Sequence, residues 1–212
     1  MKIGILGAGN VGGALGRIWA SKGHDITFGV PDPLGDRVRA AVAALQGKGR
    51  AGTNSEAVKS AEAVVLTVPW PAAEDAIHAA GGLNTKVLID CTNPVRPDLK
   101  GLEVGLTTSA AEQVAGWAQC AKVVKAFNTI GAANLGRAEF SSDQADGFYC
   151  GDDTGAKALV AALIKEAGLN PVDAGPLGNA RLLEPLAMLW IDLAVNQGWG
   201  LNHAFKLIRR QT

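Results

Sequence analysis

The stretch "KIGILGAGNVGG" (2–13) decides the fold, because a short apolar run is followed at once by closely spaced glycines. "KIGIL" (2–6) has the length and apolar content of a buried strand. "GAGNVG" (7–12) matches the spacing G-x-G-x-x-G and stands between a strand and a helix, the context that makes this pattern specific. The stretch therefore predicts a phosphate-binding turn that joins the first strand to the first helix.

The three glycines of this turn have separate physical tasks. Gly7 allows a tight turn, Gly9 lets the backbone approach a pyrophosphate, and Gly12 lets the helix pack on the strand. The helix N-terminus offers unpaired N–H groups and a partial positive charge to the phosphates. We therefore expect the whole turn to bind a dinucleotide cofactor through Gly7, Ala8, Gly9, Asn10, Val11 and Gly12.

Beyond the turn, short apolar runs alternate with helical patterns. Strands are predicted within 25–29, 61–68, 86–90, 121–127, 147–150 and 170–175, and helices at 11–23, 34–47 and 154–168. This alternation predicts a parallel sheet with helices on both faces and right-handed crossovers. The sequence thus favours the α/β class, with a Rossmann-type, doubly wound and mostly parallel sheet.

The pattern changes near residue 176. We expect residues 1–175 to form the dinucleotide-binding domain and residues 176–212 to form a small C-terminal helical segment, with helix only from 178 onward. "LEPLAMLWIDLAV" (183–195) is apolar nearly all round. Such a helix needs cover from the sheet domain, from a second subunit or from both, and we predict a homodimer.

Composition argues against several classes of protein. The chain has 20 basic and 20 acidic residues, with neither a basic stripe for nucleic acid nor a polybasic run for a membrane surface. No apolar run is long enough to span a bilayer. The three cysteines lack C-x-x-C spacing, which argues against a zinc site or a disulfide framework and fits a reducing compartment. We expect a cytoplasmic protein with no metal site.

Residues 28–33 read "FGVPDP", at the corner where a dinucleotide-binding fold contacts the adenosine ribose. Asp32 follows Gly12 by 20 residues, about the spacing of an acid that bonds the ribose 2′-hydroxyl and favours NAD. A second interpretation is equally good: Asp32 as a helix N-cap, with Pro33 at the first helical position. Both interpretations stay open on sequence grounds.

Ligands of such sheets bind beyond the carboxyl ends of the strands. Three segments follow predicted strands there, and each has an ordinary turn or helix cap as its alternative explanation. Gly131 to Ala133 are small enough to let a flat ring approach. The candidate contacts are Val68, Pro69, Trp70, Asn93 and Pro94 for the cofactor, and Phe127, Asn128, Thr129 and Ala133 for a second substrate.

No catalytic acid or base is evident. His24, His78 and His203 have positions typical of structural or solvated residues, and Cys91 has no evident activating partner. Reduction of a carbonyl normally requires a proton donor, whereas direct hydride transfer between two ring cofactors requires mainly alignment. In that case the cofactors carry the chemistry.

Several segments resemble the coenzyme-F420-dependent NADP oxidoreductase family, and more distantly the dinucleotide domain of six-transmembrane metalloreductases. The segments are "KIGILGAGNVGGALG" (2–16), "LTVPW" (66–70), "KAFNTIGAANL" (125–135), "CGDDTGAKALVAALIKEAGLNPVDAGPL" (150–177), "ARLLEPLAMLWIDLA" (180–194) and "FKLIRR" (205–210). The resemblance implies a Rossmann domain, a small helical C-terminal part and a homodimer. It also implies hydride transfer between NADP(H) and the 8-hydroxy-5-deazaflavin of coenzyme F420.

One departure from the family lies at Val30 and Pro31. The family often has Ser or Val followed by an Arg that binds the 2′-phosphate of NADP, and this chain lacks that Arg. NAD is therefore a possible cofactor beside NADP, with Val30, Pro31 and Asp32 as candidate contacts. Arg37 and Arg39 follow in the next helix, where a solvated face is the simpler explanation and phosphate contact the alternative.

Two further functions share these sequence features. One is an NAD(P)H-dependent reductase of a flavin, a quinone, or a small imine or carbonyl compound. The other is a dinucleotide-binding sensor without turnover, whose glycine turn would look identical.

Overall fold

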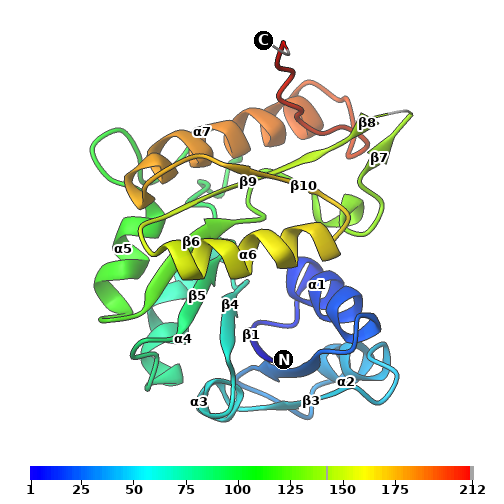
Figure 1. Ribbon diagram of the computed structural model, residues 1–212, viewed down its shortest axis with the longest axis vertical. Helices are drawn as coiled ribbons and strands as arrows, with labels where there is room; N and C mark the ends of the chain where they lie inside the picture. Colours follow the sequence, from blue (N-terminus) through cyan, green and yellow to red (C-terminus); the bar gives the residue numbers. More distant parts are fainter. Residues whose placement is uncertain (142, 211–212) are drawn as a thin grey trace.

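The computed structural model describes residues 1–141 and 143–210, and its core is an eight-stranded sheet (Figure 1). Its order is β10-β9-β6-β5-β4-β1-β2-β3, and every neighbouring pair is parallel except the antiparallel pair β6–β9. The strands are β1 (Lys2–Leu6), β2 (Asp25–Gly29), β3 (Gly49–Gly52), β4 (Ala63–Leu66), β5 (Val87–Asp90), β6 (Lys122–Ala126), β9 (Asp146–Gly151) and β10 (Asn170–Asp173). A separate hairpin pairs β7 (Glu139–Phe140) with β8 (Asp143–Gln144).

The order of the strands shows at which edge of the sheet a ligand is expected to bind. The chain passes from β1 through β2 to β3 on one side, then returns to β4 and continues to β5 and β6 on the other. The run β3-β2-β1-β4-β5-β6 is the order of doubly wound dinucleotide-binding sheets, whose ligands bind where the direction reverses. That point lies beyond the carboxyl ends of β1 and β4, where the glycine turn begins.

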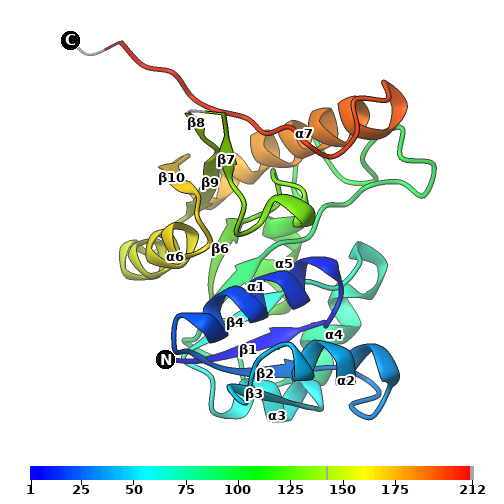
Figure 2. The same ribbon diagram turned by 90° about the vertical axis from the view of Figure 1, so that its right-hand side faces the viewer.

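Helices cover both faces of the sheet (Figure 2). On one face, Leu15 and Trp19 pack in the same apolar cluster as Val160 and Leu163; on the other, a second cluster covers the strands. This two-sided burial explains why the strands read as nearly continuous apolar runs. The helices are α1 (Asn10–Ser21), α2 (Asp36–Ala43), α3 (Asn54–Lys59), α4 (Ala73–Ala80), α5 (Ala110–Trp117), α6 (Thr154–Glu166) and α7 (Ala180–Ile191).

The predicted α/β class, the strands and the helices at 11–23 and 154–168 are confirmed, with small shifts at the ends. The helix predicted at 34–47 is shorter, because α2 spans only Asp36–Ala43. Sequence reasoning missed β3, α3, α5 and the β7–β8 hairpin. β3 reads "GRAG", which carries no strand signal, whereas the capping box of Thr53 and Glu56 at the start of α3 was available as a signal.

The prediction of helix only from 178 onward is wrong. α7 ends at Ile191, a π-helical turn follows at Asp192–Asn196, and residues 197–210 form a non-helical tail. Gly198 and Gly200 have φ of 73° and 75°, so their left-handed backbone breaks the helix. The tail runs from the end of α7 toward the β7–β8 hairpin (Figure 2). The division into two domains near residue 175 stays a prediction.

Several contacts hold the tail to the sheet domain. The side-chain amide of Asn134 donates to the carbonyl oxygen of Leu201 at 2.7 Å. The backbone N–H of Asp146 donates to the carbonyl oxygen of Phe205 at 3.1 Å. Over the residues that the structure describes, none of the helices combines the length and apolarity needed to cross a bilayer.

Candidate functional site

The glycine turn has the geometry that its sequence predicts. Gly7 has φ of 104°, a left-handed value that favours glycine. A Cβ on Gly12 would lie 2.3 Å from the Gly7 carbonyl oxygen, so no side chain fits there. A Cβ on Gly9 would have only one atom within 4 Å, Nη2 of Arg37 at 3.8 Å. The tight turn and close packing assigned to Gly7 and Gly12 are thus visible, and Gly9 borders open space.

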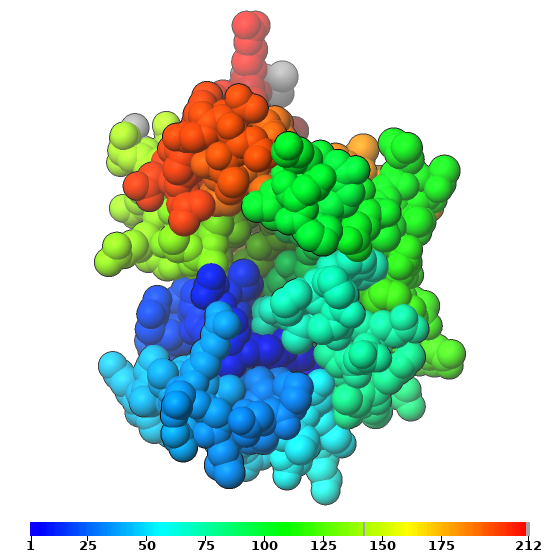
Figure 3. Space-filling model, turned by 180° about the vertical axis from the view of Figure 1, so that it is seen from behind, coloured from blue at the N-terminus to red at the C-terminus, as the bar shows by residue number. Residues whose placement is uncertain are grey.

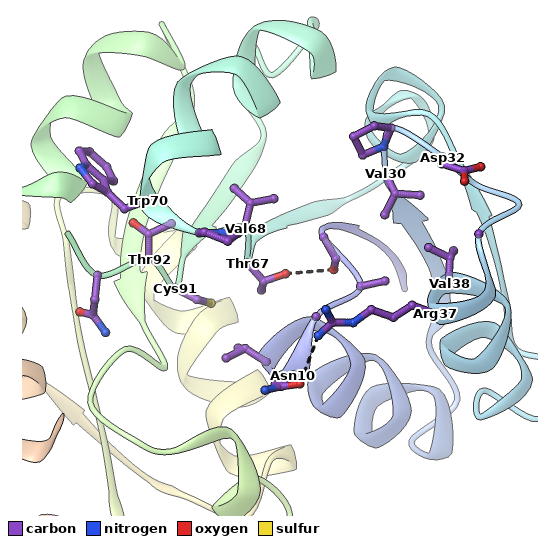
Figure 4. Close-up of a pocket in the computed structure, with 18 residues that line it drawn as sticks. Asn10, Val30, Asp32, Arg37, Val38, Thr67, Val68, Trp70, Cys91 and Thr92 are labelled. Carbon is purple, nitrogen blue, oxygen red and sulfur yellow. Dashed lines mark hydrogen bonds between the residues drawn. The ribbon is translucent and has the colours of Figure 1, made fainter. Parts of the chain in front are cut away.

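Thr67, which directly follows β4, braces this turn. Its hydroxyl donates to the carbonyl oxygen of Leu6 at 2.9 Å and to that of Gly7 at 3.1 Å, the second of which Figure 4 shows. The turn is thereby fixed to the strand across the reversal point. Sequence reasoning missed Thr67, although its place after a buried strand was a usable signal.

One cavity of about 690 Å³ runs past the turn. It extends from Val30, after β2, and Val38, on α2, to Trp70 and Thr92, beyond β4 and β5 (Figure 4). In the view from behind, the hollow lies between the blue segment of the glycine turn and the teal segment that follows β4 (Figure 3). The cavity lining is Gly7, Ala8, Gly9, Asn10, Val11, Val30, Pro31, Asp32, Gly35, Arg37, Val38, Thr67, Val68, Pro69, Trp70, Cys91, Thr92 and Asn93.

Most of the predicted cofactor contacts line this cavity. Gly12 and Pro94 do not, because both are buried behind the lining. Three predicted substrate contacts are also buried: Phe127, Asn128 and Thr129 are 2%, 6% and 3% exposed and line neither this cavity nor the one beside it. Ala133 is exposed and lines that neighbouring cavity.

Phe127 and Asn128 act as internal supports of the site. Phe127 packs edge-on against Trp19, with ring centroids 5.7 Å apart. Asn128 donates from Nδ2 to Oδ1 of Asn93 at 3.1 Å and to the carbonyl oxygen of Leu183 at 3.1 Å. Nδ2 of Asn93 in turn donates to the Asn128 carbonyl oxygen at 2.9 Å. The segment after β6 therefore fixes Asn93, which lines the cavity, through hydrogen bonds on the side away from the cavity.

In the structure, Asp32 is not the N-cap of the helix that follows it. Gly35 is the N-cap of α2, and Oδ1 of Asp32 instead accepts the backbone N–H of Leu34 at 3.1 Å. The N-cap prediction for Asp32 and Pro33 is wrong, because this local turn precedes the helix and delays it by three residues. Asp32 is exposed at the edge of the cavity.

Arg37 and Arg39 have different environments. The Arg37 guanidinium reaches over the glycine turn and donates from Nη2 to Oδ1 of Asn10 at 3.3 Å (Figure 4). Arg39 instead forms an exposed ion pair with Asp36. The simpler explanation, a solvated face, holds for Arg39, whereas Arg37 lies where a phosphate on the turn would meet it.

Among the residues that the structure describes, the cavity lining contains no acid–base pair. None of the described histidines lines it: His24 contacts Glu166 at 2.8 Å, His78 is exposed on α4, and His203 stacks on Trp190. Burial, reinforced by the neighbouring carboxylate of Asp90, raises the pKa of the Cys91 thiol. Cys91 is therefore a protonated lining residue. In the described part of the chain, no cluster of His, Cys, Asp and Glu is suited to a metal ion.

A buried charge cluster lies behind the Cys91–Asn93 segment. Nζ of Lys125, on β6, is 2.9 Å from Oδ2 of Asp90 and 2.9 Å from Oε1 of Glu184, and it donates to the Thr92 carbonyl oxygen at 2.6 Å. Burial by itself would lower the pKa of Lys125, but the carboxylates of Asp90 and Glu184 outweigh burial and raise this pKa. The ammonium group thus fixes the backbone that lines one end of the cavity.

Glu184 also caps α5. Its Oε2 accepts the backbone N–H of Ala110 at 2.9 Å, and its Oε1 accepts that of Ala111 at 3.1 Å. A carboxylate at a helix N-terminus is stabilised by the unpaired N–H groups and the helix dipole. One side chain of α7 therefore connects α5 to β6.

Comparison with known proteins places the chain in a family. The sequence model of the family described as NADP oxidoreductase, coenzyme F420-dependent, matches residues 2–94. The F420-dependent NADP reductase of Methanothermobacter marburgensis is 32% identical over 214 aligned positions, which cover 92% of this chain and 93% of that enzyme. The chain belongs to this F420-dependent oxidoreductase family.

Two solved structures and one further relative are also similar to this chain. A crystal structure from Arthrobacter sp. FB24, provisionally named an F420-dependent NADP reductase, has a TM-score of 0.89 and 31% identity, covering 99% of this chain and 100% of that one. The rat metalloreductase STEAP3 is 28% identical over 89% of this chain, but the chain spans only 37% of its length. A Streptomyces aurantiacus imine reductase, with TM-score 0.67 and 19% identity, shares the fold alone.

The residues that carry the family resemblance have largely internal positions. "KAFNT" contributes Lys125 and Asn128, and "LEPL" contributes Leu183 and Glu184. These two motifs meet through the Lys125–Glu184 salt bridge and the bond from Asn128 to Leu183. In this family member, therefore, the motifs support the lining of the site, whereas the glycine turn forms the lining itself.

Proposed function

We propose that this protein transfers hydride between NADP(H) and the deazaflavin coenzyme F420. One observation carries the proposal: a single cavity joins the corner after β2, the glycine turn and the ends of β4 and β5. An extended dinucleotide requires such a path. Relatives named for this reaction cover more than nine-tenths of the chain at 31–32% identity.

The chain's own residues fit a dinucleotide. Gly9 leaves the space that a pyrophosphate needs, and the N-terminal N–H groups of α1 face it. Arg37 supplies a positive charge over the same turn. Val30, Pro31 and Asp32 would border the adenosine ribose, while Val68, Pro69, Trp70 and Asn93 would border the nicotinamide end. NADP is the proposed cofactor.

In this reaction the residues of the chain would act by aligning the cofactor with the second substrate. Bound NADPH would supply the hydride and water the accompanying proton, so the protein needs no nucleophile. The Lys125 cluster fixes the backbone of Thr92, and Asn128 fixes Asn93. Rigid walls of this kind would hold two rings at a reactive separation, and this pre-organisation is the main contribution to catalysis that the proposal requires of the protein.

Assembly as a homodimer is part of the proposal. On α7, Leu182 and Leu189 are 67% and 49% exposed, and in the tail Trp199 and Ile208 are 67% and 85% exposed. Burial of these side chains against a second copy would remove apolar surface from water. Light scattering at micromolar concentration should give twice the chain mass of 21.8 kDa, and a mass near 21.8 kDa would refute the dimer.

A cytoplasmic location is also proposed. It rests on the three cysteines, Cys91, Cys120 and Cys150, which form no disulfide in the structure. Fractionation of the source cells, followed by immunodetection of the protein, tests the location. Recovery in the extracellular or membrane fraction would contradict it.

The proposed reaction is tested by mixing purified protein with NADPH and coenzyme F420 without oxygen, and by following the absorbance of both. Matched reactions contain a free flavin, a quinone or a cyclic imine in place of the deazaflavin. We expect the deazaflavin to be reduced fastest, with one NADPH consumed per ring. Turnover with the other acceptors only would assign a different reductase, and cofactor binding without any turnover would indicate a sensor.

A further inference from the structure

A second cavity, of about 620 Å³, adjoins the proposed cofactor cavity. The two cavities share Ala8, Gly9, Asn10 and Arg37, so they meet along the glycine turn. Away from the turn, the second cavity continues between α1 and the segment that contains Gly131 to Ala133. A molecule in the second cavity can thus lie beside a cofactor in the first.

The second cavity is lined by small residues on one wall and by an aromatic side chain on the other. On the α1 side the wall is formed by small residues such as Gly13 and Ala14, and on the opposite side by Ala133 and the indole of Trp190. A Cβ on Gly131 would lie 2.6 Å from Trp190, so glycine is required for the indole to pack there. Trp190 is fixed in turn, because its Nε1 donates to the His203 carbonyl oxygen at 2.9 Å. The cavity therefore has a rigid apolar wall.

The charge of the second cavity is positive. Arg17 from α1 and Arg37 from α2 line it, and the lining contains no Asp or Glu. In the described part of the chain neither arginine has a carboxylate within salt-bridge distance, whereas Arg39 has Asp36. With 20 basic and 20 acidic residues in the whole chain, two unpaired guanidinium groups along one cavity are a local excess of positive charge. Guanidinium groups suit phosphate and carboxylate ligands.

We propose that this second cavity binds the acidic tail of the deazaflavin substrate, and that Arg17 is the residue that recognises the tail. The proposal rests on the proposed function and adds a subsite to it. The side chain of coenzyme F420 carries phosphate and carboxylate groups, which match the two arginines in charge. Arg37 faces both cavities and also serves the cofactor, but Arg17 lines the second cavity alone.

The test compares two substrates that share one ring. Coenzyme F420 has the acidic tail, and the 8-hydroxy-5-deazaflavin with only a ribityl chain lacks it. KM is measured for both with wild type, Arg17→Ser, Arg17→Lys and Arg39→Ser. Arg39 is a matched control, because it is an exposed helical arginine that lines neither cavity.

We expect Arg17→Ser to raise the ratio of the F420 KM to the tailless KM about tenfold, equivalent to the loss of one charge-assisted contact. Arg17→Lys should restore most of the loss, and Arg39→Ser should leave the ratio unchanged. For wild type, the F420 KM should rise with ionic strength more steeply than the tailless KM, because salt screens exposed charges.

Three results would overturn the proposal. An unchanged KM ratio in Arg17→Ser would show that Arg17 does not contact the tail. An equal loss of NADP affinity in Arg17→Ser, measured by calorimetry, would assign the second cavity to the cofactor. If wild type reduces neither deazaflavin, the proposed function fails first and the subsite falls with it, a result distinct from the other two.

Discussion

Lys125 on β6 and Glu184 on α7 form a salt bridge of 2.9 Å whose side chains are 0% and 1% exposed. Asp90, also fully buried, adds a second carboxylate at 2.9 Å from the same ammonium nitrogen. Removal of one member of a buried ion pair leaves a charge without compensation, which costs far more than loss of a surface pair. Stability of the site therefore depends on all three side chains together.

Replacement of the single cation in this cluster should be strongly destabilising. Lys125→Met keeps most of the side-chain volume but leaves two buried carboxylates facing each other. We expect the free energy of unfolding to fall by about 3–5 kcal/mol. Urea denaturation followed by circular dichroism measures it. Arg39→Met, which removes an exposed pair with Asp36, is the control and should cost less than about 1 kcal/mol. Equal losses in the two variants would contradict the role given to Lys125.

The contribution of Lys125 should disappear only at alkaline pH. Its folded pKa is raised from the ordinary 10.5, because Asp90 and Glu184 outweigh the effect of burial. A raised folded pKa means that the stabilisation is fully present below pH 10.5 and is lost as pH rises through the folded pKa. The difference in unfolding free energy between wild type and Lys125→Met should thus not shrink from neutral pH to about pH 10 and should shrink above it. A difference that already shrinks between pH 7 and pH 9 would count against this assignment.

Gly9→Val should abolish cofactor binding without unfolding the protein. Space for the new Cβ exists, since only Nη2 of Arg37 lies within 4 Å, but that space is where a pyrophosphate would lie. We expect affinity for NADP(H) to fall at least about 100-fold, or about 2.7 kcal/mol, by calorimetry. Gly12→Val is the contrasting variant: its Cβ would lie 2.3 Å from the Gly7 carbonyl oxygen, so it should lower the unfolding temperature markedly. Unchanged affinity in a folded Gly9→Val protein would remove the glycine turn from the cofactor site.

Pro31→Arg should improve binding of NADP more than that of NAD. Pro31 is exposed at the edge of the cavity, where an arginine could pair with a 2′-phosphate. The expected gain for NADP is about 1–3 kcal/mol, the range of hydrogen bonds to charged groups. Affinities of both cofactors are measured in wild type, Pro31→Arg and Arg37→Ser. If Pro31→Arg brings no gain while Arg37→Ser loses NADP affinity selectively, Arg37 holds the phosphate and the corner at Pro31 does not.

Much of the fold follows from the sequence because local signals agree with one another there. The first strand, the glycine turn and α1 combine apolar content, glycine spacing and helical periodicity in one stretch. β3 was missed because "GRAG" has two glycines and no apolar pair, and it forms a strand only through its pairing with β2. The tail was wrongly predicted as helix, since Gly198 and Gly200 take left-handed backbone conformations that end the helix.

Less of the site could be predicted from the sequence, because the residues that hold its lining in place come from segments far apart in the chain. Lys125 lies inside an apolar run, where a buried lysine is unusual, but nothing local points to Glu184 as its partner. Arg37 and Arg39 look alike in sequence, and only the orientation of α2 turns one toward the glycine turn. Phe127 and Asn128 follow a strand as lining residues do, but the backbone of Phe127, with φ of 61°, places them in the interior.

The buried charge cluster also restricts how this chain can change over evolutionary time. Loss of Lys125, Asp90 or Glu184 alone passes through a protein with an unmatched interior charge, whereas joint replacement by apolar residues of similar size can be neutral. Glu184 carries a further restraint, because the first N–H groups of α5 depend on it. Related sequences should therefore keep all three residues or replace them as a set, and a homologue with an apolar residue at one position should have correlated changes at the other two.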